Sequence, residues 1–252
     1  MIKTLILLLA LTTHGLAVGS LSNAPKGDPP KEEPSKIPVI KGLPLKVTTY
    51  GTDLIVHFEV GGHTYYSKAY ARPIHPGNSA SGVTWGIGYD SGYNTAKEIR
   101  DDWKEYVDSK ELALMIQCAG LKGNRAKWKQ QQIRWKVHIT YEQAMAVFIK
   151  RTMPRFCALA KKYCPDIINA NPYIQDAVVS NGYNRGWRTS GYSRRHVKAI
   201  TVASREKKFH SIPQIIRDSK VIWQNHSMRA GIQRRREWEA QHGEGRGRFI
   251  KN

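Results

Sequence analysis

Apolar residues recur every three or four positions over much of the chain after residue 94, which predicts a series of amphipathic helices. Three of these segments open on a side chain that can cap the first turn of a helix. The first predicted helix starts at Asn94 or Thr95, another opens with the capping-box pattern Thr140–Gln143, and a third opens with Asn171–Pro172. The other predicted helices are Leu112–Cys118, His196–Ser204, Pro213–Trp223 and Met228–Gln241. We expect the helix after Asn171 to be the central buried one. Pro154 either kinks the helix before it or starts the next.

A different pattern precedes these helices. Thr64–Tyr70 and Val83–Tyr89 are rich in aromatic and β-branched residues and are separated by prolines and Gly77, which predicts the two strands of a hairpin. Glycines at 82, 86 and 88 weaken the second strand as a packing element, so another backbone or a ligand is expected to come close there. A sugar chain lying across the hairpin fits this expectation.

Glu59 stands at the end of the apolar run Leu54–Phe58 and just before Gly61. The run fits a short helix that Thr52 or Asp53 caps and Gly61 ends, although its propensities fit a strand equally well. In a helix, Glu59 leaves the last turn against an apolar wall. Such a setting disfavours the charged carboxylate and lets it hold a proton near neutral pH, as a general acid must.

The segment Ser81–Gly92 (SGVTWGIGYDSG), together with Glu59, resembles the phage-type lysozymes, and more closely their pesticin-like branch, in which a Glu precedes a Thr and then an Asp. Further downstream, residues 176–186 resemble the core helix of that family with its Asn-Arg-Gly turn, and residues 231–237 resemble its C-terminal arginine-rich helix. The resemblance covers roughly residues 52–241.

The resemblance implies a muramidase that cuts the β-1,4 bond between N-acetylmuramic acid and N-acetylglucosamine in peptidoglycan. It assigns Glu59 as the general acid, Asp90 as the base or electrostatic stabiliser, and Thr84 as the hydroxyl that positions water. Asp90 lies beside Ser91 and Gly92 at a polar strand end, so we expect its charge to stay solvated. Candidate substrate-binding residues are Tyr66, Trp85, Tyr89, Asn184 and Arg185.

The expected fold class is α+β and mostly helical. By resemblance it is a two-lobed, lysozyme-like fold, with a small hairpin lobe, a helical C-terminal lobe and a cleft between them. The expected divisions are a signal peptide at 1–19, a flexible linker rich in proline and lysine at 20–46, the catalytic domain at 47–243 and a disordered tail at 244–252.

The first residues give the expected location. A positive start and the apolar run Leu5–Leu11, which is too short to cross a bilayer, predict a cleaved signal peptide and a secreted or periplasmic protein. A retained N-terminal membrane anchor is the alternative.

The formal net charge of +20 predicts an anionic partner, such as peptidoglycan, lipopolysaccharide or an anionic membrane. Lys122–Lys136 mixes basic residues with Trp128 and Trp135, as in a polyanion-binding strip; the alternative is a solvated helix face with two half-buried tryptophans. Nucleic acid is not expected, because the leader opposes it and no helix-turn-helix or ribonucleoprotein signature is present. Arg234–Arg236 is interpreted as structural, pairing with acids such as Glu237 and Glu239.

No cofactor or metal is expected, since the histidines are scattered and no zinc spacing occurs, and the protein is expected to be a monomer. Cys157 and Cys164 can form a disulfide only if the helix between them ends, whereas Cys118 can pair with either. A lytic transglycosylase and an inactive wall-binding protein are the other hypotheses, and the stereochemistry of cleavage stays open.

Overall fold

The structure, a computed structural model, describes residues 38–77, 80–225 and 229–246. These residues are mostly helical and include a small two-stranded antiparallel sheet, which confirms the expected α+β class. In chain order the elements are α1 (Thr49–Val60), α2 (Gly62–Ala69), β1 (Thr84–Trp85), β2 (Tyr89–Asp90), α3 (Ala96–Trp103), α4 (Ser109–Ile116), α5 (Gly123–Ile133), α6 (Tyr141–Val147), α7 (Met153–Tyr163), α8 (Pro172–Arg185), α9 (Arg195–Arg205), α10 (Ile212–Asp218) and α11 (Arg229–Gly243).

The folded part begins before the predicted boundary at Val47. Leu45 is buried, and the backbone N–H of Lys46 donates to Gln175 Oε1 on α8 at 2.8 Å. The predicted signal peptide and residues 20–37 of the predicted linker lie outside the described residues, as do residues 247–252 of the predicted tail. Glu244, at the start of that tail, forms an ion pair with Arg217 at 2.7 Å.

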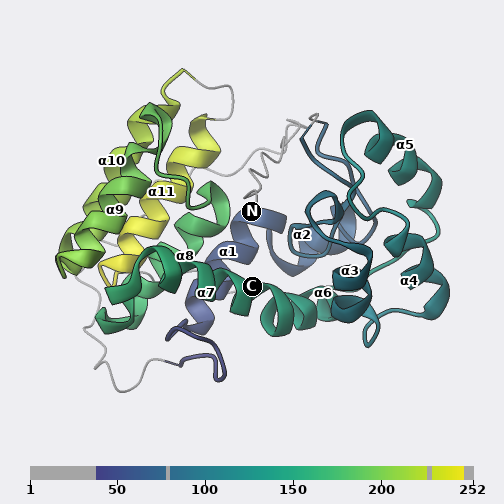
Figure 1. The fold of residues 1–252 in the computed structure, drawn as a ribbon, viewed down its shortest axis with the longest axis horizontal. Coiled ribbons are helices and arrows are strands. Elements are labelled where there is room, and N and C mark those ends of the chain that lie inside the picture. Colours follow the sequence, from purple (N-terminus) through teal and green to yellow (C-terminus); the bar gives the residue numbers. More distant parts are fainter. Residues whose placement is uncertain (1–37, 78–79, 226–228, 247–252) are drawn as a thin grey trace.

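Helix α8 is the central buried helix, as predicted. The Asn171 side chain caps it by accepting a hydrogen bond from the Ile174 N–H, with Pro172 in the first turn. Residues from Ile174 through Tyr183 are buried without interruption, so the helix has no solvent-facing side over that length. It contacts α1, α7, α10 and α11, and Figure 1 shows it among these helices.

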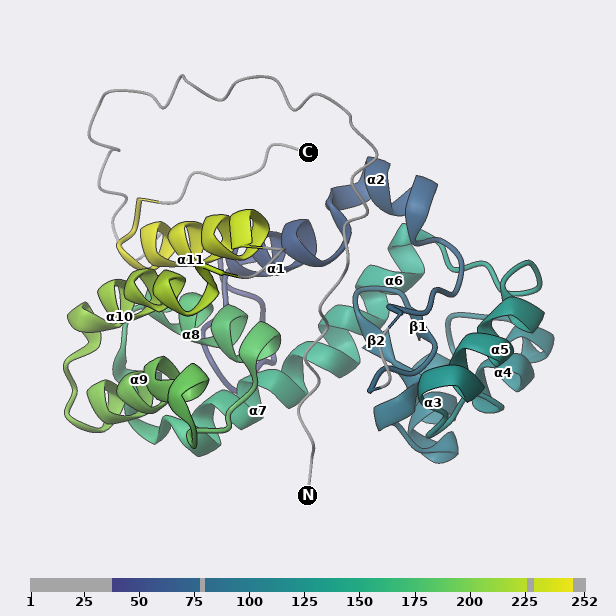
Figure 2. The same ribbon diagram turned by 90° about the horizontal axis from the view of Figure 1, so that it is seen from above.

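Helices α6 and α7 are joined by a π-helical turn at Phe148–Thr152, so the chain is helical from Tyr141 to Tyr163 without a break. Pro154 lies in the first turn of α7, which is the second of the two predicted alternatives. Proline lacks an N–H and clashes with the carbonyl four residues earlier, so the wider turn accommodates it. Figure 2 shows this segment running between helices α8–α11 and the group formed by α3, α4, α5 and the sheet.

The predicted hairpin is wrong in its first strand. Residues 64–69 form most of helix α2 instead, which starts directly after the left-handed Gly61 and has Tyr70 as its C-cap. The hairpin spans Thr84–Asp90, so it covers most of the stretch predicted as the second strand and ends one residue beyond it, with a turn in which Gly86 and Gly88 both have positive φ. Aromatic content suggested a strand, but tertiary packing decided the helix, because Tyr66 fills the core from it.

Local capping signals correctly predicted where α3 and α6 begin. Thr95 and Thr140 each form the full capping box, with Glu98 and Gln143 respectively. Helix α9 extends His196–Ser204 by one residue at each end, whereas α10 stops at Asp218 and continues as a 3-10 turn to Trp223. Met228 lies outside the described residues, and α4 starts three residues before the predicted Leu112.

The three cysteines are buried free thiols. Burial raises the pKa of Cys118 and Cys157 to about 12 and that of Cys164 to about 11, so the thiols stay protonated near neutral pH. Within the described ranges, no helix combines the length and apolar character needed to cross a membrane.

The close packing of α8 gives a stability test. A Cβ added at Gly182 would lie 2.0 Å from the Trp187 ring, so Gly182→Ala should lower the free energy of unfolding by about 2 kcal/mol. Gly231→Ala is the matched control, because nothing lies within 4 Å of a Cβ there and alanine favours a helix by about 0.5–1 kcal/mol. Urea denaturation measures both. Equal effects of the two substitutions would contradict this account of the packing.

Candidate active site

Glu59 lies in the last turn of α1, so the helical alternative for this segment is correct. The cap is Thr48, earlier than the predicted Thr52 or Asp53, and its side chain accepts from the Gly51 N–H. Gly61 ends the helix in the left-handed conformation with φ +69°, as expected. This longer helix places Glu59 inside the molecule, where only 4% of the surface of the residue is exposed.

The partner of Glu59 is an arginine and not an apolar wall, which corrects the expected environment. Arg235 Nη1 on α11 lies 2.6 Å from Glu59 Oε1, and the same guanidinium binds Glu239 Oε1 through Nε at 3.0 Å. Burial acts to lower the pKa of Arg235, but the charges of Glu59 and Glu239 outweigh it and the pKa is raised. Arg236 lies 3.0 Å from Glu239, so two cations and two anions share this buried site.

Thr84 and Asp90 face each other across the sheet as direct partners in the β1–β2 ladder. Direct partners in an antiparallel ladder have Cα atoms roughly 4.5–5.5 Å apart, so the hydroxyl and the carboxylate belong to one small site. Thr84 Oγ1 is buried and has no hydrogen-bond partner within the described residues. A buried unpaired hydroxyl costs about 1–3 kcal/mol, which calls for a functional or solvent partner.

Asp90 is buried, with 3% of its surface exposed, so the expectation of a solvated charge is wrong. Its carboxylate accepts hydrogen bonds from the N–H groups of Gly82 at 2.9 Å and Gly92 at 2.7 Å. Burial raises its pKa to about 6, while these two bonds and the charge of Lys122 act in the opposite direction. The Gly82 backbone packs so closely that a Cβ there would lie 2.3 Å from Gly92 N, which confirms the expected backbone approach.

Tyr183 of α8 connects the part of the candidate site that holds Glu59 and Arg235 with the hairpin that carries Thr84 and Asp90. Its hydroxyl donates to the carbonyl of Ile87, in the turn between β1 and β2, at 2.7 Å. Burial and then the charge of Glu59 raise the pKa of Tyr183 well above its ordinary value, so it stays a neutral donor. The helix that underlies Arg235 therefore also holds the hairpin that carries Thr84 and Asp90.

Three predicted substrate-binding aromatic residues are core residues in this structure. Tyr66 is fully buried and donates to the Ile139 carbonyl at 3.0 Å. Trp85 is buried and stacks on Tyr89, whose hydroxyl donates to Asp102 at 2.9 Å. In this structure their rings are therefore buried in protein contacts, and none presents an exposed face to a sugar.

Asn184 and Arg185 at the end of α8 are also occupied by protein contacts. Asn184 Oδ1 accepts from Arg236 Nη2 at 2.9 Å, and Arg185 Nη2 donates to the Ser193 carbonyl at 2.8 Å. The Arg185 guanidinium is buried over the Trp223 ring. Both side chains support the buried end of α8 rather than a binding surface.

The arginine cluster was interpreted correctly as structural, but its role at Glu59 was missed. Arg235 and Arg236 pair with Glu239, as the short spacing suggested, whereas Glu237 pairs with Arg217 and Lys220 instead. Nothing local signals that Arg235 reaches Glu59, 176 positions away in the sequence. Among the described residues, no cluster of three or more histidine, cysteine or acidic side chains could hold a metal ion.

Residues 55–227 match the model of a family described as "Domain of unknown function (DUF8812)", over more than half of the chain. The chain belongs to this family. The DUF8812 range contains Glu59, Thr84 and Asp90 and ends before α11, which supplies Arg235. Comparison with curated proteins finds no match.

The raised pKa of Asp90 predicts a pH-dependent stability. The folded carboxyl titrates at about 6 against an ordinary 3.8, so its stabilising contribution is full below pH 3.8 and is lost as the pH rises through 6. The loss is on the order of 2–3 kcal/mol. Asp90→Asn keeps an Oδ1 acceptor for both glycine N–H groups but does not titrate, so its unfolding free energy should fall less over this range. Parallel curves for the two proteins, from urea denaturation at each pH, would exclude this assignment.

Proposed function

We propose that this protein is a glycoside hydrolase that cleaves the β-1,4 bond between N-acetylmuramic acid and N-acetylglucosamine in bacterial peptidoglycan. The observation that carries the proposal is the pairing of Thr84 with Asp90, in which a carboxylate of raised pKa faces a buried hydroxyl that has no hydrogen-bond partner among the residues that the structure describes. The order of Glu59, Thr84 and Asp90 along the chain, which resembles that of the pesticin-like lysozymes, adds support.

Each of these residues has a distinct role in the proposed reaction. Glu59 donates a proton to the leaving glycosidic oxygen, and Asp90 accepts a proton from the attacking water or stabilises the oxocarbenium-like centre. Thr84 holds the water, which gives its hydroxyl the hydrogen-bond partner that the described part of the chain does not supply. Asp90 suits the basic role because a base is most effective when its pKa lies near the working pH.

Access to the site requires movement, because Glu59 and Asp90 are both buried. We assign the helices α8–α11 and the group of α3–α5 with the hairpin to two lobes, with the glycan bound in a cleft that opens between them. The π-helical turn at Phe148–Thr152 lies in the segment joining the two groups, and π-helical turns within helices are found frequently at functional sites. In this proposal, opening also separates the Glu59 carboxyl from Arg235 and exposes it to the glycan.

The charge of the protein fits an extracytoplasmic wall polymer as substrate. A net charge of +20 concentrates the protein at polymers with acidic peptide stems. Together with the signal peptide predicted for residues 1–19, this charge supports a secreted or periplasmic protein, which we propose acts as a monomer.

The first test is Glu59→Gln. Removing the proton donor should lower the rate of product release from purified sacculi by about 10²–10⁴-fold. It also leaves Arg235 short of one partner, so rates must be compared at a temperature where circular dichroism shows both proteins folded.

Asp176→Asn is the matched control for this loss of a buried charge. Asp176 is a buried carboxylate that binds His242 at 2.8 Å and Thr48, outside the proposed reacting groups. Its variant should be destabilised but active while folded. Equal activity of wild type and Glu59→Gln would refute the hydrolase.

The pKa of Asp90 predicts the acidic side of the activity profile. If Asp90 is the base, kcat/KM should rise with pH through about 6 as the carboxyl loses its proton. The rate of sacculus digestion at limiting substrate, measured from roughly pH 5 to 8, tests this. A profile with no acidic limb would remove Asp90 from the chemistry.

One observation favours a lytic transglycosylase as the second candidate. The Asp90 carboxylate is engaged by the N–H groups of Gly82 and Gly92, a contact set that also suits a purely structural residue. A transglycosylase needs one Glu and no second carboxylate. Full activity of Asp90→Asn together with anhydro-muramyl products in mass spectrometry would favour this candidate over the hydrolase.

A further inference from the structure

Helix α5 and the turn after it carry two tryptophans in the open. Trp128 is 63% exposed and Trp135 is 72% exposed, so neither is half-buried as the alternative interpretation required. Tryptophan is highly buried on average, and covering its large apolar surface is favourable, so two exposed rings in one short segment mark a candidate binding surface. The two rings are seven positions apart, about two helical turns.

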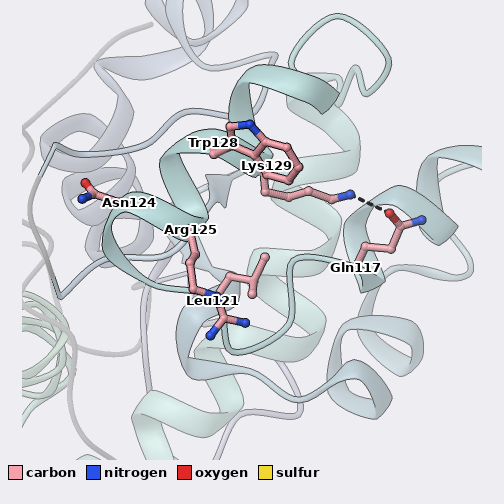
Figure 3. Close-up of a pocket in the computed structure, with 6 residues that line it drawn as sticks. All are labelled: Gln117, Leu121, Asn124, Arg125, Trp128 and Lys129. Carbon is pink, nitrogen blue, oxygen red and sulfur yellow. Dashed lines mark hydrogen bonds between the residues drawn. The ribbon is translucent and has the colours of Figure 1, made fainter.

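A hollow of about 600 Å³ lies beside Trp128, between α5 and the end of α4. Its lining combines an indole and a leucine with two amides and two cations: Trp128, Leu121, Gln117, Asn124, Arg125 and Lys129. Figure 3 shows Arg125 extending beside Leu121, and Lys129 extending from α5 to Gln117, whose Oε1 lies 2.6 Å from the ammonium. Its volume suits a small group such as one sugar unit of a polymer.

The two charged residues that line this hollow, Arg125 and Lys129, are both positive. Lys122–Lys136 contains six lysine and arginine residues and no aspartate or glutamate. Arg125 and Lys127 are exposed, and within the described ranges neither they nor Lys129 form an ion pair. Such uncompensated charge attracts an anionic ligand.

The indole rings of Trp128 and Trp135 differ in whether other side chains cover their faces. The guanidinium groups of Arg72 and Arg134 lie 4.8 and 5.3 Å from the centre of the Trp135 ring. No stacking or cation–π contact involves Trp128 in the described part of the chain, so its ring is open to a ligand. A single open ring above a hollow suits one sugar ring better than a row of stacked bases, which needs successive platforms.

We propose that the hollow beside Trp128 binds one acidic amino-sugar unit of a peptidoglycan strand and so docks the protein on its polymer away from the reacting groups. Trp128 covers the apolar face of the sugar, Gln117 and Asn124 serve its acetamido and hydroxyl groups, and Arg125 binds a carboxylate of the peptide stem. A flat membrane surface fits a concave site less well. The choice of polymer rests on the proposed function, whereas the anionic character of the ligand rests on the charges.

The test is co-sedimentation with purified sacculi, with every protein carrying Glu59→Gln so that the polymer is not consumed. Trp128→Ala and Arg125→Gln should each weaken binding about tenfold. Tyr192→Ala and Lys110→Gln are the controls, because they remove an exposed ring and an exposed cation elsewhere and should leave binding within about twofold. Unchanged binding in both hollow variants would overturn the proposal.

Two further arms separate this ligand from other anions. The same variants are tested on vesicles of phosphatidylglycerol with phosphatidylcholine and on single-stranded DNA. Dependence on Trp128 for either of these, with sacculus binding unaffected, would overturn the proposal in favour of that partner.

Failure of the hydrolase is distinguishable from failure of the docking site. Trp128-dependent binding to sacculi that wild type does not digest would support docking and refute hydrolysis. Digestion by wild type, with binding that does not depend on Trp128 or Arg125, would support hydrolysis and refute docking at the hollow.

Discussion

The buried guanidinium of Arg235 is the interaction on which the rest of this structure depends. It joins α11 to α1 through Glu59 and binds Glu239 on its own helix and the Ser180 carbonyl of α8. A charge this deep is tolerated only while its partners remain, and removing one partner of a buried pair typically costs about 3–5 kcal/mol. Glu59 therefore contributes to stability in the closed protein, and its proposed chemistry requires that this contribution be given up when the site opens.

The hairpin is the second constraint, and it is small enough to be set by its contacts. Two residues on each side pair around a glycine turn, and Tyr183 fixes that turn to α8 through the Ile87 carbonyl. Asp90 then closes the neighbouring loop by accepting from two backbone N–H groups. Because the same carboxylate holds the loop and faces Thr84, the geometry of the site and the folding of the loop are linked.

The sequence predicted most where the interaction is local. The caps at Thr95, Thr140 and Asn171 were found because a side chain bonds a backbone group three residues away, which spacing reveals. The first strand failed for the opposite reason. Tyr66 and its neighbours have β propensity, but their state depends on burial against distant residues such as Ile139. The solvated Asp90 failed likewise, since burial is a property of the whole packing.

The sequence by itself determined the helical class, the buried centre at α8, the left-handed stop at Gly61 and the order of the three candidate catalytic residues. Only the tertiary structure decided that Glu59 meets Arg235, that Asp90 is buried at a pKa of about 6, and that Trp128 stands open beside a hollow. The physical reason is the distance along the sequence between the residues that interact. Hydrogen bonds and turns act between residues a few positions apart, whereas burial and charge pairing join residues that only the completed fold brings together.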